Sequence, residues 1–246
     1  MQKRRFLKAE WRNLLMLNYE VDPEILKPYL PFATVIDQWQ EKTLVSMVGF
    51  MFEETAVLGM KWPGHVNFEE VNLRFYVRHF DGREWKRGAV FISEIVPKPL
   101  IALIANNLYK EHYRALPMRH NFSRVDNEHS LFLYEWKLNG TWNKLGAIVS
   151  HRFEEIKPGS AEEFIFEHYW GYNSLGDGKT MEYEVEHAAW ETAAVKHPVL
   201  EADIAGLYGD AFVPWLEAKP YSAFFAKGSG IKVRAGRRIT GPVLMG

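Results

Sequence analysis

The sequence predicts an α+β fold dominated by β-strands, organised as a single domain over residues 1–246. Three observations predict this class: about nine or ten short segments have strand-like patterns, one long stretch has helical spacing, and aromatic residues make up 15% of the chain. Broad aromatic rings pack well on pleated sheets. An antiparallel sheet of this size usually curls into a barrel or a sandwich, because closure removes its edges.

The first hundred residues contain mainly strand patterns and one short helix. Strands are expected over residues 14–18, 43–52, 66–79 and 88–96. Asp22 and Pro23 provide an acidic cap and a proline at the first helical position, and Pro31 ends the helix that follows them. Gly49 indicates a bulge or a close backbone approach in its strand. The pair Asp81-Gly82 predicts a hairpin between the last two strands.

The long helix is expected to follow Pro99. Its apolar residues recur at helical spacing from Leu100 to Leu108, and the stripe continues to His112. The helix should end before Ala115, because the residue that precedes Pro117 is disfavoured in helical geometry. The sequence therefore predicts one convincing helix of about three turns in the middle of the chain.

The second half returns to strands, expected over residues 119–125, 129–138, 142–153, 180–187, 190–196, 222–227 and 230–234. Asn139-Gly140 predicts a tight hairpin between the second and third of these strands. Ser160 and Glu163 match a capping box and predict a second short helix. The stretch from Lys227 to Gly230 is interpreted as a hairpin turn between the last two strands.

Composition excludes several classes of function. The 30 basic and 31 acidic residues nearly balance, so no polyanionic partner such as a nucleic acid is indicated. The absence of cysteine excludes disulfides, thiolate metal sites and a cysteine nucleophile, and it is consistent with the cytoplasm. No apolar run is long enough for a membrane span. We expect a protein without a membrane partner. The sequence leaves open whether the protein forms a homo-oligomer.

The strand over residues 66–79 carries the most suggestive polar pattern. Glu70, Asn72 and Arg74 alternate with apolar residues and therefore share one face of the strand. If this face lines an interior cavity, Arg74 can bind a substrate carboxylate or carbonyl while Asn72 orients it, and Glu70 can transfer a proton. If the face looks outward, Glu70 and Arg74 form a solvated ion pair. Alternation alone leaves both interpretations open.

Other chemistry-bearing residues are more ambiguous. His187 is a candidate acid or base or a structural histidine, and Arg152 is an inward-facing or a surface arginine. Tyr19 belongs to the aromatic residues that could line a pocket, although most such rings form core. The nine histidines show no metal-binding spacing within one element, so we expect no metal and no other cofactor.

Several blocks of the chain resemble the YqjF-like family, a family of uncharacterised bacterial proteins with acetoacetate-decarboxylase-like folds. The blocks are LLMLNYEVDPEILKPYLP, FEEVNLRFYVR, HYRALPM, VEHAAW and SAFFAKGSGIKV, and together they span nearly the whole chain. The resemblance implies a closed or nearly closed antiparallel β-barrel, decorated by one long and two short helices, with a cavity at one end. It implies no settled activity.

The resemblance also implies that the imine chemistry of the superfamily is missing. Its decarboxylases form a Schiff base through a lysine that follows a proline, beside a second lysine. In this sequence Met118 follows Pro117, and Arg119 takes the second position. A thioether cannot form an imine, and an arginine is too basic to act as a neutral amine. Glu20 also stands where the superfamily has an arginine, which reverses the charge.

Two hypotheses follow. In the first, the cavity binds a small carbonyl- or carboxylate-bearing metabolite without turnover. In the alternative, the protein is a metal-free enzyme that performs acid/base chemistry on such a metabolite, as a lyase or decarboxylase does. The predicted catalytic residues are Glu70 and Arg74, and the predicted substrate-binding residues are Asn72, Tyr19, Met118, Arg119, Arg152 and His187.

Overall fold

The computed structural model describes residues 5–57 and 59–240. The strands are β1 (Arg5–Glu20), β2 (Val35–Ile36), β3 (Leu44–Val57), β4 (Phe68–Phe80), β5 (Trp85–Val96), β6 (Tyr113–Ala115), β7 (Met118–Arg124), β8 (His129–Leu138), β9 (Thr141–Glu155), β10 (Trp170–Gly176), β11 (Lys179–His187), β12 (Glu191–Glu201), β13 (Ser222–Arg234) and β14 (Arg237–Thr240). The helices are η1 (Pro23–Tyr29), α1 (Pro99–Tyr109), α2 (Ala161–Phe166), α3 (Ile204–Tyr208), η2 (Asp210–Phe212) and α4 (Val213–Leu216), where η denotes a 3₁₀-helix. The predicted β-dominated α+β class is therefore confirmed.

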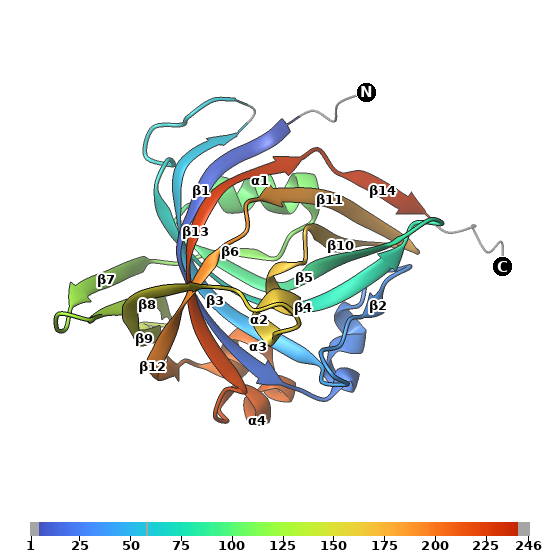
Figure 1. Cartoon of the computed structure of the whole chain (residues 1–246). Coiled ribbons are helices and arrows are strands. Elements are labelled where there is room, and N and C mark those ends of the chain that lie inside the picture. The colour runs from blue at the N-terminus through green and yellow to red at the C-terminus, as the bar shows by residue number, and fades with distance from the viewer. Residues whose placement is uncertain (1–4, 58, 241–246) are drawn as a thin grey trace.

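The described residues form a 14-stranded sheet whose pairings include a closed path. The path runs β11–β10–β5–β4–β3–β1–β13, and β13 pairs again with β11. Figure 1 shows these strands wrapping around a common interior, with β1 and β13 side by side. The prediction of a purely antiparallel sheet is wrong, because β5 pairs in parallel with both β10 and β6. Helix α1 lies between β5 and β6 along the chain and lets β6 run in the direction of β5.

A second group of strands continues from β13 through β12, β9, β8 and β7, all antiparallel. The β7–β8 hairpin projects from the body of the molecule (Figure 1). The predicted turn between β8 and β9 is confirmed, since Asn139 and Gly140 both have positive φ angles, 49° and 85°. This is the backbone conformation that two-residue hairpin turns require.

Strand β4 is buried on both faces and separates two hydrophobic clusters. Its odd-numbered residues, such as Val71 and Phe75, pack in a cluster with side chains of β8 and β9. Its even-numbered residues face the other side, where Phe68 and Tyr76 pack with α2. Glu70 and Asn72 therefore lie on the inner face of the closed strand path, and each residue is 2% exposed.

The three predicted helices, η1, α1 and α2, begin where the sequence indicates, whereas α3, η2 and α4 were not predicted. Asp22 caps η1 by accepting a hydrogen bond from the Glu24 amide, and the Ser160 hydroxyl oxygen accepts one from the Glu163 amide at the start of α2. The predicted continuation of the long helix to His112 is wrong. Helix α1 ends at Tyr109 because Lys110 adopts the left-handed conformation, with φ 56° and ψ 40°.

Two glycines lie where another segment of the chain packs closely against their strand. The hairpin expected between Lys227 and Gly230 is wrong, since β13 runs through this stretch without a reversal. Gly228 has φ +81° and pairs with Arg12 of β1, where a side chain would overlap the Trp11 carbonyl oxygen. At Gly49 the close approach is made by a side chain and not by backbone, because a Cβ atom there would lie 2.7 Å from the Tyr134 ring.

Candidate functional site

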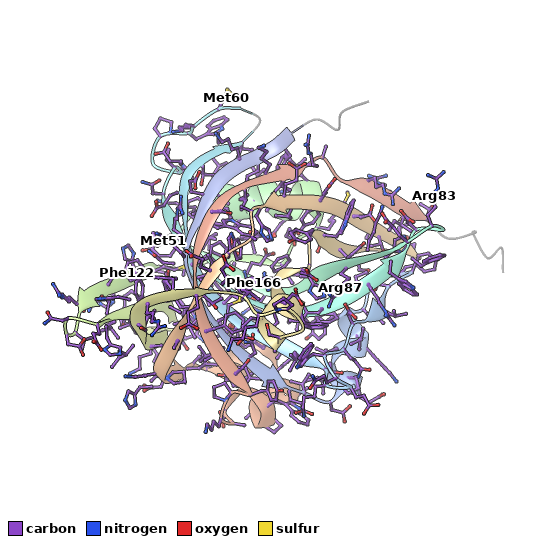
Figure 2. All side chains as sticks on the ribbon, viewed as in Figure 1. Met51, Met60, Arg83, Arg87, Phe122 and Phe166 are labelled. Carbon is purple, nitrogen blue, oxygen red and sulfur yellow. The ribbon has the colours of Figure 1, made fainter. Side chains whose placement is uncertain are left out.

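A cavity of about 130 Å³ lies on the inner face of the closed strand path, against α1 and α2. Aromatic side chains form much of its wall, and they include Trp11, Phe52, Phe68, Phe166, Trp170 and Trp190. Figure 2 labels Phe166, which lies near the middle of the molecule, far from Phe122 on the projecting hairpin. The polar part of the wall consists of Glu70, Arg74, Glu94, Glu111, Tyr113, His168, Tyr183 and His187. An apolar cavity with a few grouped polar side chains is the usual form of a small-molecule site.

Glu70 is held in place by two hydrogen bonds. The Asn72 amide donates to one carboxylate oxygen over 2.9 Å, and the Tyr113 hydroxyl donates to the other over 2.9 Å. Burial raises the pKa of Glu70 to about 7, although these hydrogen bonds and the Arg74 charge act in the opposite direction. Glu70 can therefore both lose and gain a proton near neutral pH.

Two further glutamates meet at the same wall. Glu94 of β5 pairs in register with Asn72 of β4, and Glu111 follows α1. Burial raises the pKa of both carboxyl groups, and the neighbouring carboxylates raise the pKa of Glu94 further. The two carboxyl groups are also hydrogen-bonded to each other, which requires that they share a proton. The wall thus holds three acidic groups that resist simultaneous ionisation.

Two tyrosines fix the positions of the acidic groups. Tyr113 reaches Glu70, and the Tyr183 hydroxyl donates to Glu111 over 2.7 Å. Burial raises the pKa of both tyrosines well above the ordinary value, so they stay protonated donors. Gly171 of β10 makes room for the Tyr183 ring, because a Cβ atom at this position would overlap it.

Arg74 provides the positive charge of the cavity. Its guanidinium contacts the Met16 sulfur at 3.9 Å and lies over the Tyr76 ring at 5.8 Å from the centroid. Its Nε atom is buried and has no hydrogen-bond partner. A guanidinium with open donors is suited to binding a carboxylate or carbonyl oxygen.

His168 lines the cavity and is held by an aspartate, Asp37. The His168 side chain is 2% exposed, and its Nε2 lies 3.2 Å from an Asp37 oxygen that also accepts a 2.7 Å hydrogen bond from Arg87. Burial lowers the pKa of His168 to about 4, so the imidazole is neutral at physiological pH. Although burial opposes it, the pKa of Asp37 is lowered by hydrogen bonds from His168 and Arg87. Asp37 therefore accepts the Nε2 proton and leaves Nδ1, which has no partner, as an acceptor.

The structure brings four of the eight predicted site residues together. Glu70, Arg74 and His187 line the cavity, and Asn72 supports Glu70. His187 stacks on Trp190 with 4.3 Å between ring centroids, and burial lowers its pKa. These positions are compatible with the predicted roles, which stay predictions.

The other four predicted residues lie away from the cavity. Tyr19 belongs to the hydrophobic cluster on the far side of β4, and Met118 packs against that cluster. Arg119 pairs with Glu135 through hydrogen bonds of 2.7 and 2.9 Å on the β7–β8 hairpin. Arg152 is 83% exposed in its side chain and borders a separate surface groove. The structure gives none of the four a contact with the acidic wall.

No lysine is among the described residues that line the cavity. Lys110, the nearest lysine to Pro117 on its N-terminal side, is exposed at the end of α1. Within residues 5–57 and 59–240, no group of three or more acidic, histidine or cysteine side chains has the geometry to hold a metal ion. The same ranges include no helix with the length and apolar character needed to cross a membrane.

Sequence reasoning missed several residues of the wall. Glu94 interrupts an apolar run in β5, and this interruption was the available signal for a buried carboxyl group. Glu111 lies in the stretch that the spacing predicts as helix, so its place after the end of α1 gave no signal for a wall residue. His168 and Tyr183 had no local signal, because their roles arise from contacts between segments far apart in the chain.

Comparisons with known proteins agree on the fold. Residues 8–230 match the model of the family DUF2071, described as "Uncharacterized conserved protein (COG2071)". An acetoacetate decarboxylase-like enzyme from Sphingomonas wittichii RW1 is 13% identical with a TM-score of 0.68, and the alignment covers 96% of this chain and 94% of that chain. The enduracididine biosynthesis enzyme MppR, complexed with pyruvate, is 14% identical with a TM-score of 0.68 and coverages of 97% and 91%.

A third solved structure, acetoacetate decarboxylase from Legionella pneumophila, is 13% identical with a TM-score of 0.62 and coverages of 96% and 87%. No curated protein matches the sequence. At these identities the likeness to the solved structures shows a common fold.

Proposed function

This chain belongs to the DUF2071 family, and we propose that it binds a small carbonyl- or carboxylate-bearing metabolite in the cavity beside Glu70 and Arg74, without forming an imine. The family match also confirms the YqjF-like, acetoacetate-decarboxylase-like resemblance of the sequence. In this proposal the closed strand path acts as a barrel that encloses the ligand, and the protein works in the bacterial cytoplasm. A pairing of two copies is compatible with the proposal and not required by it.

One observation carries the proposal: a guanidinium with an open donor and a buried carboxyl group share an aromatic cavity that no described lysine lines. Arg74 can bind a ligand oxygen through charge-assisted hydrogen bonds. The aromatic wall excludes water and so strengthens such bonds. Pyruvate, the compound in the MppR complex, is an example of the ligand class.

The pKa of Glu70 favours a second candidate function. A carboxyl group with a pKa of about 7 is suited to general acid/base catalysis at neutral pH. Glu70 would take a proton from a carbon next to the ligand carbonyl, while Arg74 stabilises the negative charge that develops on oxygen. His168 Nδ1 can accept a hydrogen bond from a ligand hydroxyl.

Replacement of Arg74 tests the binding proposal. We expect isothermal titration calorimetry with pyruvate and acetoacetate to show binding to the wild-type protein. We expect Arg74→Gln to weaken this binding by about 10- to 100-fold, because charge-assisted hydrogen bonds are lost. Arg78→Gln is the matched control, since Arg78 lies on the same strand but is exposed. Equal affinities of the Arg74 variant and the wild-type protein contradict the proposal.

Borohydride trapping tests the absence of imine chemistry. We expect incubation with acetoacetate and sodium borohydride to leave the mass of the intact protein unchanged, since the described cavity wall offers no lysine. Mass spectrometry detects an adduct, and peptide mapping locates it. A reduced adduct on any lysine contradicts the interpretation of Met118.

A further inference from the structure

The polar and apolar side chains of the cavity lie at different levels along β4. Phe68, Glu70 and Arg74 point to the same side of this strand, and all three line the cavity. The Arg74 guanidinium reaches back along the strand, because it contacts the sulfur of Met16, and β3 aligns Met16 with Asn72. The guanidinium therefore lies about four residues, or ~13 Å, from the level of Phe68 along the strand. Glu70 lies between these two levels.

Aromatic side chains from other segments gather at the Phe68 end. Phe52 of β3 pairs in register with Phe68 and stacks on its ring, with 4.9 Å between centroids. Trp11 of β1 packs edge-on against Phe52 at 6.0 Å, and Trp190 packs against Trp11 at 6.4 Å. Ile101 of α1 packs against the same cluster. All five side chains line the cavity, so a ligand meets mainly apolar surface at this end.

Pyruvate is short compared with the distance between the two ends. Its three carbons span two bonds of about 1.5 Å each. When its carboxylate binds Arg74, its methyl group does not reach the Phe68 ring, and the aromatic end stays unfilled. An apolar cavity of about 150 Å³ can bind benzene, a compound of six carbons. The cavity here has a similar volume of about 130 Å³, so a ligand of about six carbons fills it better than one of three.

We propose that the ligand carries an apolar tail, so that it belongs to the 2-oxo acids and related carbonyl acids with about three or four carbons beyond the carbonyl group. The carboxylate binds Arg74, the carbonyl group lies beside Glu70, and the tail contacts Phe52, Phe68 and Ile101. Burial of the tail against these side chains adds affinity that pyruvate cannot obtain. This assignment rests on the proposed function in one respect, which is the binding of the carboxylate by Arg74.

A series of 2-oxo acids that differ only in their tails tests this assignment. Pyruvate, 2-oxobutanoate, 2-oxopentanoate and 2-oxohexanoate are titrated into the intact protein at pH 7 in a calorimeter. We expect the affinity to rise about three- to fourfold with each added carbon, because each one buries a further methylene group. 2-Oxoadipate has the six carbons of 2-oxohexanoate but ends in a second carboxylate. It should bind at least about tenfold more weakly, because this charge enters aromatic surroundings without a partner.

Ile101→Phe tests the position of the tail. The larger side chain takes up room at the aromatic end, so we expect the affinity for 2-oxohexanoate to fall about tenfold and that for pyruvate to change less than about threefold. Leu103→Phe is the matched control, since Leu103 lies on the same helix and is 60% exposed. It should leave both affinities unchanged.

Equal affinities across the series, or equal affinities for 2-oxoadipate and 2-oxohexanoate, would overturn the assignment of an apolar tail. An equal loss for pyruvate and 2-oxohexanoate in Ile101→Phe would also contradict it. Arg74→Gln should retain the same increase in affinity per carbon at lower overall affinity. A variant that binds as tightly as the wild-type protein therefore contradicts the role of Arg74, whereas a series without dependence on chain length contradicts the tail.

Discussion

Gly228→Ala is expected to lower the free energy of unfolding by about 3 kcal/mol or more, the range typical of severe backbone strain. Gly228 has φ +81°, and a Cβ atom there would overlap the Trp11 carbonyl oxygen and lie 2.7 Å from Leu14 Cδ1. The overlapped atom belongs to the backbone of β1, so a side-chain rotation cannot relieve it. The β1–β13 pairing has to separate locally, and Trp11, which lines the cavity, moves with it. Chemical denaturation followed by tryptophan fluorescence measures the effect.

Gly140→Ala is the matched control for this change. Gly140 has φ +85°, nearly the same as Gly228, but a Cβ atom there would meet nothing within 4 Å. Its replacement should cost about 1 kcal/mol, from backbone conformation alone. The difference between the two variants isolates the clash with β1. If both variants lose the same stability, close packing of β1 on β13 is not what requires glycine at position 228.

Gly228 also shows where strand prediction from the sequence fails. Glycine and serine between two apolar segments usually indicate a turn, and this pattern predicts a turn from Lys227 to Gly230. In the structure this glycine instead allows β13 to pass very close to β1. A glycine in a turn and a glycine at a close approach between strands produce the same local sequence pattern. Only the position of the partner strand distinguishes them. By contrast, Asn139-Gly140 and the caps of η1 and α2 were predicted correctly, because those interactions are local.

In the candidate site too, local features could be predicted from the sequence, and contacts between distant segments could not. Alternation along β4 places Glu70, Asn72 and Arg74 on one face, and the structure places that face inside. Alternation groups the residues of one face but does not tell which face of β4 lines the cavity. In the structure both faces of β4 are buried. Glu94 and Glu111 reach Glu70 from different segments, so no spacing in the sequence connects them. The acidic wall forms only when the chain folds, whereas the polar face of β4 can be seen in the alternation of one segment.

Glu70→Gln is expected to flatten the pH dependence of stability by about 3 kcal/mol, which is the free energy that corresponds to a pKa raised from 4.5 to about 7. In the folded protein Glu70 binds its proton more tightly than in the unfolded chain. The folded state therefore gains protons relative to the unfolded state between these two pKa values, and the wild-type stability falls as the pH rises from about 4.5 to about 7. Glutamine keeps the shape of the side chain and cannot ionise, so this fall disappears from the variant.

Urea denaturation from pH 4 to pH 8 measures this difference, and Glu128→Gln should retain the wild-type slope because Glu128 is exposed. Glu94 and Glu111 have raised pKa values too, so the Glu70 variant should keep the part of the decline that these two groups contribute. Tyr113 can rotate its hydroxyl to accept a hydrogen bond from the new amide, which limits any loss of stability at low pH. If the Glu70 variant kept the full wild-type slope of unfolding free energy against pH, ionisation of Glu70 would not destabilise the folded protein. It would then have no raised pKa with which to transfer a proton at neutral pH.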